Sequence, residues 1–326
     1  MSLDGILKGV VSFIGGTALA ISLVGCPQPN TKPDYTAEKT AITKAADRLL
    51  QLQNANGSWD WNVTGASGPT TKTYLNIAGV TAEGLLDAYK TTGDSKYLTA
   101  AKKAGDFLKT GYSSNVTVLG SGNNVNAFNV KFLYDLGSVS GTSSYTAEAT
   151  TLMNKVLTAY PLPQDLVNAD ANARVNLIEG VGEGIVPWDL FNYVSDANSA
   201  GNSSWANNLE GLAQTETIPS STDPTYILGL SAFTIGGNAT AKKLLQDAQN
   251  SDGTWSDASG TVQDTAYAVM ALVKTGDMAR AESGVKAGVK TQLANGGWSD
   301  ATGGNNNEFS EVDSEVIQAI SYYISQ

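Results

Sequence analysis

Apolar and polar residues alternate along most of the chain in two kinds of helical segment. In the first kind the apolar positions form one stripe: over 95–111, Ala100, Ala104 and Leu108 share a face opposite Lys102 and Asp106. In the second kind nearly every position is apolar, as a helix surrounded by other helices requires. The amphipathic helices are predicted at 36–54, 95–111, 143–158, 203–214, 239–249 and 279–293, and the apolar helices at 73–92, 124–137, 178–196, 223–236, 262–275 and 308–324.

This strict alternation predicts an all-α fold, an (α/α)6 toroid of six outer and six inner helices. An open solenoid is the alternative, but it needs polar terminal repeats, whereas the last helix ends in Ile320, Tyr322, Tyr323 and Ile324. The connections from outer to inner helices are long and rich in Gly, Asn and Ser. We expect them to share one mouth of the ring, because loops above a rigid frame usually carry the binding site.

A short motif, Gln-x-x-x-Gly-x-Trp, marks three outer-to-inner connections. The Gln and Trp residues of the three copies are Gln53 and Trp59, Gln249 and Trp255, and Gln292 and Trp298. The last two copies are 43 residues apart, a period typical of helix-pair repeats. The three copies, with Asp264-Thr265-Ala266 opening an inner helix, resemble the squalene–hopene cyclase and protein prenyltransferase superfamily. The resemblance implies that the Gln and Trp side chains brace helix ends; exposed stacking platforms are the alternative.

The activity of that superfamily is not expected here. The cyclase motif Asp-x-Asp-Asp-Thr-Ala aligns with 261–266, where Gln263 replaces the catalytic acid and only Asp264 remains. An amide cannot protonate an alkene, so terpene cyclisation is disfavoured. The prenyltransferase branch needs Asp, Cys and His around zinc, and the chain has no histidine. Asp264 is then either an N-cap of its helix or a functional carboxylate.

Composition and charge narrow the chemistry further. The formal net charge of −11 argues against a nucleic-acid partner, because nothing here neutralises phosphates. The absence of histidine excludes Ser-His-Asp and Cys-His catalysis and removes the commonest metal ligand. We therefore expect no metal and no cofactor, although a calcium site built from carboxylate and carbonyl oxygens stays open.

The N-terminus resembles a bacterial lipoprotein signal peptide. An uncharged stretch over 9–25 leads through small residues to Cys26, the only cysteine. The predicted organisation is a signal peptide over 1–25, a lipidated Cys26 with a Pro-rich tether over 26–35, and one toroid domain over 36–326. A transmembrane anchor of similar length is the alternative. The resemblance implies a monomer in the bacterial cell envelope, attached to the membrane through its lipid and, with Pro27 after the cysteine, more typical of the outer membrane.

Carboxylates, amides and aromatic residues gather in the loops and helix starts of the expected mouth, and this set suits a neutral glycan. Two carboxylates about 5–9.5 Å apart could also cleave a glycosidic bond. Whether the protein is an enzyme, a glycan-binding protein or a non-catalytic module that holds a surface protein stays open; an enzyme would be a glycoside hydrolase or similar to a polysaccharide lyase. The candidate catalytic residues are Asp264, Glu183 and Asp189, and the candidate substrate-binding residues are Trp61, Trp188, Tyr226, Asn126, Glu308 and Glu311.

Overall fold

The computed structural model of the chain describes residues 33–70, 72–113, 125–164, 187–215, 218, 221, 226–257, 260–302 and 305–326. The chain divides into two compact units, Met1–Asp34 and Tyr35–Gln326. The second unit carries the fold and is the one considered below. Cys26 and Glu183 lie outside the described residues, so the anchor and that candidate carboxylate stay predictions.

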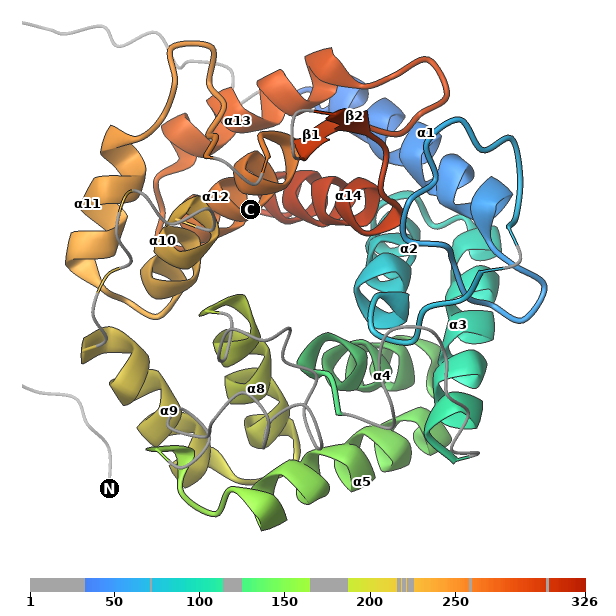
Figure 1. Cartoon of the computed structure of the whole chain (residues 1–326), viewed down its shortest axis with the longest axis vertical. Coiled ribbons are helices and arrows are strands. Elements are labelled where there is room, and N and C mark those ends of the chain that lie inside the picture. The colour runs from blue at the N-terminus through green and yellow to red at the C-terminus, as the bar shows by residue number, and fades with distance from the viewer. Residues whose placement is uncertain are drawn as a thin grey trace, which may run out of the picture. The chain divides into compact units, whose positions relative to one another are not determined.

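The second unit is an all-α ring of two concentric layers (Figure 1). Outer and inner helices alternate along the chain, as the hydrophobic pattern predicts. The outer helices are α1 (Thr36–Leu52), α3 (Ser95–Ser113), α5 (Ser143–Ala159), α9 (Ser203–Thr215), α11 (Ala239–Asp247) and α13 (Met278–Thr291). The inner helices are α2 (Ala78–Thr92), α4 (Ala127–Ser140), α8 (Pro187–Ser199), α10 (Tyr226–Ile235), α12 (Val262–Lys274) and α14 (Ser310–Ile324).

The inner layer is closed, because α14, the last helix, packs against α2, the first inner helix. Glycines allow this approach. A methyl group at Gly84 would collide with Ser314 of α14, and one at Gly79 would collide with Asn129 of α4. Ser314 Oγ also donates to the Val80 carbonyl (2.6 Å) and accepts from the Gly84 amide (2.9 Å). The closure therefore combines backbone contact with hydrogen bonds, and the open solenoid is excluded.

The three Gln-x-x-x-Gly-x-Trp motifs connect neighbouring outer helices. Each Gln amide donates to a carbonyl within its own loop and to one on the next outer helix: Gln53 to Ala100, Gln249 to Arg280 and Gln292 to Ala41. The Gln292 bond joins the end of α13 to α1, so the last motif closes the outer layer. Trp59, Trp255 and Trp298 are fully buried, and each indole N–H donates to a carbonyl ten residues earlier.

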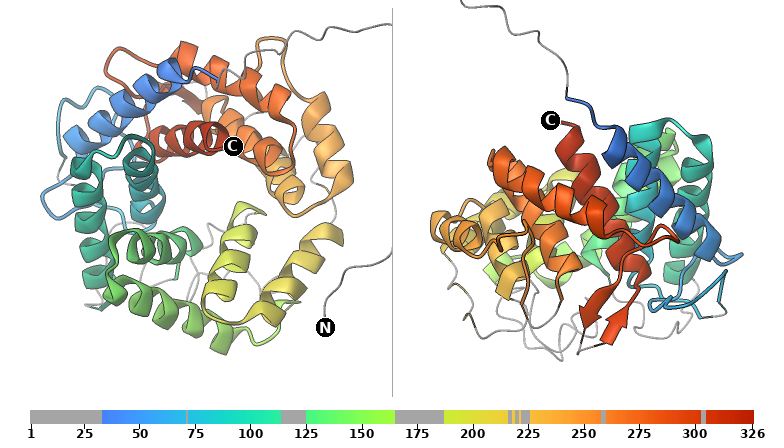
Figure 2. Two further views of the ribbon diagram at one scale, coloured as in Figure 1. Left: turned by 180° about the vertical axis from the view of Figure 1, so that it is seen from behind. Right: turned by 90° about the horizontal axis from the view of Figure 1, so that it is seen from above.

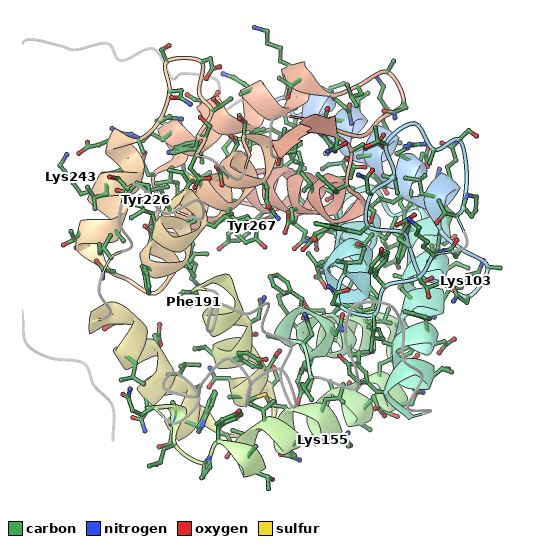
Figure 3. The ribbon with its side chains drawn as sticks, viewed as in Figure 1. Lys103, Lys155, Phe191, Tyr226, Lys243 and Tyr267 are labelled. Carbon is green, nitrogen blue, oxygen red and sulfur yellow. The ribbon has the colours of Figure 1, made fainter. Side chains whose placement is uncertain are left out.

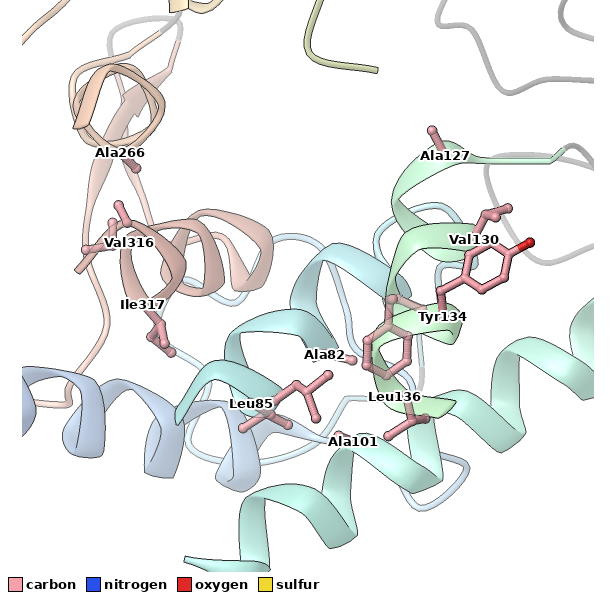
Figure 4. Packing of buried hydrophobic residues seen from close by; sticks show 14 of the residues in the cluster. Ala82, Leu85, Ala101, Ala127, Val130, Tyr134, Leu136, Ala266, Val316 and Ile317 are labelled. Carbon is pink, nitrogen blue, oxygen red and sulfur yellow. The ribbon is translucent and has the colours of Figure 1, made fainter. Parts of the chain in front are cut away.

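The apolar faces of both layers form one continuous core. The close-up in Figure 4 shows Ala266 and Val316 where α12 meets α14, and Leu85, Ala101 and Leu136 between the inner and outer layers. Burial of these side chains on both sides of the inner helices explains why their sequences are apolar nearly all round. In the part of the chain that the structure describes, no helix has the length and apolar character needed to cross a membrane.

Two details differ from the expected elements. The inner helix expected from residue 73 begins at Ala78, and the loop expected over 294–307 contains a short antiparallel hairpin of β1 (Asp300–Thr302) and β2 (Asn305–Asn307). Polar residues without a helical period form that hairpin, so the pattern gave no signal for it. In the side view, the loop after α1 and the hairpin lie on one face of the ring, opposite the C-terminus (Figure 2). We call this face the mouth.

Candidate functional site

Asp264 stands in the first turn of α12 and is fully buried. One carboxylate oxygen accepts the Asp257 backbone N–H (2.9 Å), and the Asp257 carboxylate in turn accepts the Ile227 N–H at the start of α10. Burial, followed by repulsion from Asp257 and Asp300, raises the pKa of Asp264 to about 8. Asp264 therefore braces the starts of two inner helices. Asp264 has no exposed surface, and its expected catalytic role stays a prediction.

The N-terminal cap of α12 is supplied by Asp300 and not by Asp264. Asp300 of β1 accepts the backbone N–H groups of Thr261, Val262 and Gln263 at 2.7–3.1 Å. These are amides at the start of α12 that have no partner inside the helix. The hairpin thus supplies the cap that the sequence pattern assigned to Asp264, and an acidic residue 36 positions away gives no local signal of it.

Glu308, an expected substrate-binding residue, is held by contacts within the protein. It is buried and forms a two-pronged ion pair with buried Arg48, with nitrogen–oxygen distances of 2.7 and 3.1 Å. Asn295 donates a third hydrogen bond to it (2.9 Å). A ligand could reach Glu308 only by displacing these donors, so its role here is to fix the mouth loops against α1.

Trp61 and Glu311 do lie together at the mouth. Trp61 is 45% exposed and rests on Phe309, with ring centroids 5.0 Å apart and planes inclined by 30°. Its indole Nε1 donates to Glu311 Oε2 (3.1 Å). Burial raises the pKa of Glu311 to about 7, and the bond from Trp61 opposes part of that rise. The result is an accessible aromatic face beside a carboxyl group that titrates near neutral pH.

Glu315 lies one turn further along α14 and completes this group. Its two oxygens accept from Tyr267 Oη (2.8 Å) and Gln263 Nε2 (2.9 Å), both on α12. Burial, together with repulsion from Glu311, raises the pKa of Glu315 well above its usual range. We call Trp61, Gln263, Tyr267, Glu311 and Glu315 the mouth cluster.

Glu311, Glu315, Gln318 and Tyr322 recur at helical spacing along α14 and form a polar stripe that faces the inner ring. Glu315 contacts α12, and Gln318 donates to the Val80 carbonyl of α2 (3.1 Å). Tyr267 is seen in Figure 3 beside the central opening of the ring. The stripe therefore lines the lumen from the mouth inward, which the helical spacing alone left open.

The other predicted residues are dispersed. Asn126 is the N-cap of α4, where its side chain accepts the Asn129 N–H (3.2 Å). Tyr226 is half-buried in the first turn of α10 and packs against the core. Trp188 and Asp189 lie in the first turn of α8, but the structure describes only their backbone. None of the contacts described for Asn126, Tyr226 or α8 places them beside Trp61.

Tyr267 was not among the residues expected from the sequence, although a signal for it exists. Thr265 and Asp313 each accept the backbone N–H of a motif tryptophan, from Trp255 and Trp298 respectively. Tyr267 and Glu315 each stand two residues further on, so they occupy equivalent positions. Glu83, two residues after Thr81 in the matching stretch of α2, falls in the same register. Alignment of the inner helices by repeat thus finds the residues that face the lumen.

Among the described residues, no group of three or more His, Cys, Asp or Glu side chains is placed to hold a metal ion. The mouth cluster has only two carboxyl groups, and Glu315 already accepts two hydrogen bonds. The cluster offers acid–base chemistry and hydrogen bonding.

Comparison with known proteins identifies the architecture. No protein-family model matches the chain, and no curated protein sequence matches it. Among solved structures, the chain is similar to an unsaturated glucuronyl hydrolase specific for heparin (TM-score 0.60, 13% identity, covering 90% of this chain and 98% of the other). It is also similar to the GH76A α-1,6-mannanase from Salegentibacter sp. HEL1_6 (TM-score 0.58, 11% identity, covering 89% and 100%).

A third similar structure is a possible member of the GH105 family from Salmonella enterica (TM-score 0.55, 14% identity, covering 91% of this chain and 96% of the other). These likenesses extend over nearly the full length of both chains and establish the α/α toroid. At such low identity they establish the fold alone.

Proposed function

We propose that the mouth of the ring binds a neutral glycan and that Glu311 is the general acid of a glycoside-cleaving site. The observation that carries the proposal is the exposed Trp61 ring, hydrogen-bonded to a carboxyl group whose pKa is raised to about 7. Aromatic faces cover the C–H surface of sugars, and an acid with a pKa near the working pH is the efficient donor to a glycosidic oxygen. The similarity to toroid glycosidases supports this choice of chemistry by analogy.

Glu315 is proposed to line the site as a protonated neighbour of Glu311. Its carboxyl group is held by Tyr267 and Gln263 and is buried, so it does not reach a substrate directly. Two carboxyl groups four residues apart on one helix face are close enough to disfavour simultaneous ionisation. This repulsion raises the pKa of Glu315, so we expect Glu315 to stay protonated and neutral beside Glu311.

The second carboxylate would come from another inner helix. A retaining mechanism needs a nucleophile about 5–5.5 Å from the acid, and an inverting one needs a base about 6.5–9.5 Å away. Asp189, in the first turn of inner helix α8, is our candidate. Glu183 is the second candidate.

A glycan-binding role without cleavage is the second candidate function, and the exposed Trp61 ring, packed on buried Phe309, favours it independently of any carboxylate. A terpene cyclase is not proposed, although the motif resemblance to that superfamily remains our explanation for the helix-bracing Gln and Trp residues. Gln263, at the position of the cyclase acid, donates an amide N–H to Glu315 in a hydrogen bond. An amide is not acidic enough to protonate an alkene. We retain the proposal that Cys26 is lipidated and attaches the protein to the cell envelope.

The test is glycan turnover by the full chain. The protein would be incubated with neutral and acidic polysaccharides, and new reducing ends would be measured for wild type, Glu311→Gln and Asp189→Asn. Glu282→Gln, on the exposed outer helix α13, is the matched control. Cleavage lost in Glu311→Gln alone or in both variants supports the proposed site. Binding without cleavage supports the second candidate, and neither binding nor cleavage overturns both and directs the search to protein partners.

A further inference from the structure

A polar cavity lies in the ring, at the carboxyl ends of the inner helices. Its volume is about 630 Å³, within the range of small-molecule sites. Residues of α2, α4, α12 and α14 line it, among them Glu83, Lys131, Met270 and Tyr322. We call this cavity the lumen pocket. It is separate from the mouth cluster, which stands at the amino ends of α12 and α14.

Five charged side chains on α2 and α4 form one wall of the lumen pocket. Lys131 contacts Asp135 at 2.6 Å, and Lys90 contacts Asp87 at 2.9 Å. The same two ammonium groups are further from Glu83 Oε1, at 3.4 and 3.6 Å. Each lysine is thus committed mainly to an aspartate, and the wall holds three carboxyl groups against two ammonium groups.

Glu83 is the group that this arrangement leaves incompletely satisfied. Its residue is 5% exposed, it lines the pocket, and its Oε2 has no hydrogen-bond partner. A buried carboxyl oxygen without a donor is costly, since burial removes water without replacing it. While Glu83 is protonated it can share its proton with Asp135, but once Glu83 ionises Oε2 needs one more donor.

The charge balance indicates which donor fits. Burial, as the largest effect, raises the pKa of Glu83 to about 8, and Asp135 and Asp87 add to the rise while Lys131 and Lys90 oppose it. The carboxyl ends of α2 and α14 add partial negative charge. Lys39 also lines the pocket, but it is exposed, so solvent screens its charge.

We propose that the lumen pocket binds the ammonium group of a primary-amine ligand, with Glu83 Oε2 as its hydrogen-bond acceptor. A third ammonium group would balance the three carboxylates of the wall and supply the missing donor. Tyr322 offers a hydroxyl and Gln318 an amide oxygen to the polar part of such a ligand, and Met270 offers an apolar surface. The proposal does not depend on glycan cleavage at the mouth.

The test compares two ligands of equal size by calorimetry with the full chain: 2-aminoethyl glucoside and 2-hydroxyethyl glucoside. A primary alkylammonium stays protonated at pH 7. We expect the amine to bind about tenfold or more tightly, because hydrogen bonds to charged groups are the stronger ones. Binding should also release close to one proton, as Glu83 ionises, which is measured as a difference in binding heat between phosphate and HEPES buffers.

Glu83→Gln keeps the shape of the side chain but cannot ionise, so it should lose both the preference for the amine and the proton release. Glu282→Gln should retain both. Equal affinity for the two glucosides, no binding of either one, or an unchanged preference in Glu83→Gln would each overturn the proposal. Glu311→Gln should leave amine binding intact, which separates this site from the proposed glycan site.

Discussion

Trp61 donates its indole N–H to Glu311 across 250 residues of sequence, so the loop after the first helix and the first turn of the last helix meet at one point. The contact brings an exposed aromatic ring and a titratable carboxyl group into one small area of the mouth. Isolated β-bridge pairing between Asn62 and Phe309 holds the two segments beside it. A ligand that stacks on Trp61 would therefore lie next to Glu311.

Trp61→Ala should weaken glycan binding about threefold to tenfold, which corresponds to the free energy typical of one aromatic contact. The indole is 45% exposed, so the free energy of unfolding should change much less than for a buried tryptophan. Binding would be measured by titration and unfolding by thermal melting. Leu162→Ala removes a 61%-exposed apolar side chain and should leave binding unchanged. Equal binding by Trp61→Ala would remove this ring from the site.

The proposed acid role of Glu311 predicts a pH profile. Because its pKa is raised to about 7, the protonated form dominates below pH 7, and any cleavage that needs this proton should fall as the pH rises through 7. Glu311→Gln should lower the rate about 10²–10⁴-fold at pH 6. A rate that stays constant from pH 6 to pH 9 in the wild type would assign the proton transfer to another group.

Much of the fold could be predicted from the sequence, because it rests on local and periodic signals. The alternation of amphipathic and apolar segments gave the two layers, and the repeated Gln, Gly and Trp marked the connections between outer helices. The site was harder to predict. Trp61 and Glu311 were each selected for residue type, but nothing local shows that they touch.

Long-range pairing also explains the residues whose roles changed. Glu308 was expected to bind substrate, but it pairs with Arg48, which lies 260 residues earlier in the sequence. Asp264 was expected to be a cap or a catalyst; Asp300 caps its helix, and Asp264 is buried, so its catalytic role stays a prediction. Burial and partner identity at these positions depend on ring closure, which a helical period does not encode.

The raised pKa of Asp264 gives a stability prediction of opposite sign from that of a salt-bridged aspartate. A carboxyl group whose pKa is about 8 in the folded state and near 3.9 when unfolded binds more protons when folded. Its contribution to the free energy of unfolding is most favourable below pH 4 and is lost progressively as the pH rises to 8. Asp264→Asn should remove this pH-dependent contribution to the free energy of unfolding, which changes by up to about 1.4 kcal/mol per pH unit.

Melting curves from pH 5 to pH 9 would check this. Relative to wild type, Asp264→Asn should gain stability as the pH increases. Asp247→Asn, on the exposed side of α11, should follow the wild type at every pH. Parallel curves for Asp264→Asn and wild type would show that this carboxyl group ionises normally.

The buried ion pair between Arg48 and Glu308 predicts a large loss on removal of one partner. Arg48→Met leaves Glu308 buried without its counter-charge, and such changes typically cost about 3–5 kcal/mol. Arg280→Met breaks the exposed pair with Asp277 and should cost about 1 kcal/mol or less. Denaturant unfolding measures both. Restoration of stability by adding Glu308→Gln to Arg48→Met would identify the uncompensated carboxylate as the cause.

Ring closure itself can be tested at Gly296. Its φ of +99° is strained for any residue with a side chain, and a methyl group there would also collide with the backbone carbonyl of Lys44 on α1. Gly276 has a similar φ of +80° but open space around it, so Gly276→Ala measures the backbone strain alone, about 1–2 kcal/mol.

Gly296→Ala should cost clearly more than Gly276→Ala, because α13 must move away from α1 and lengthen the Gln292–Ala41 hydrogen bond, now 2.9 Å. The free energies of unfolding would be compared by denaturant titration, and amide hydrogen exchange at α1 would report loosening at the closure. Equal losses for the two glycine variants would mean that the last Gln-x-x-x-Gly-x-Trp motif adds no closing contact, and that the contact between α14 and α2 alone holds the ring shut.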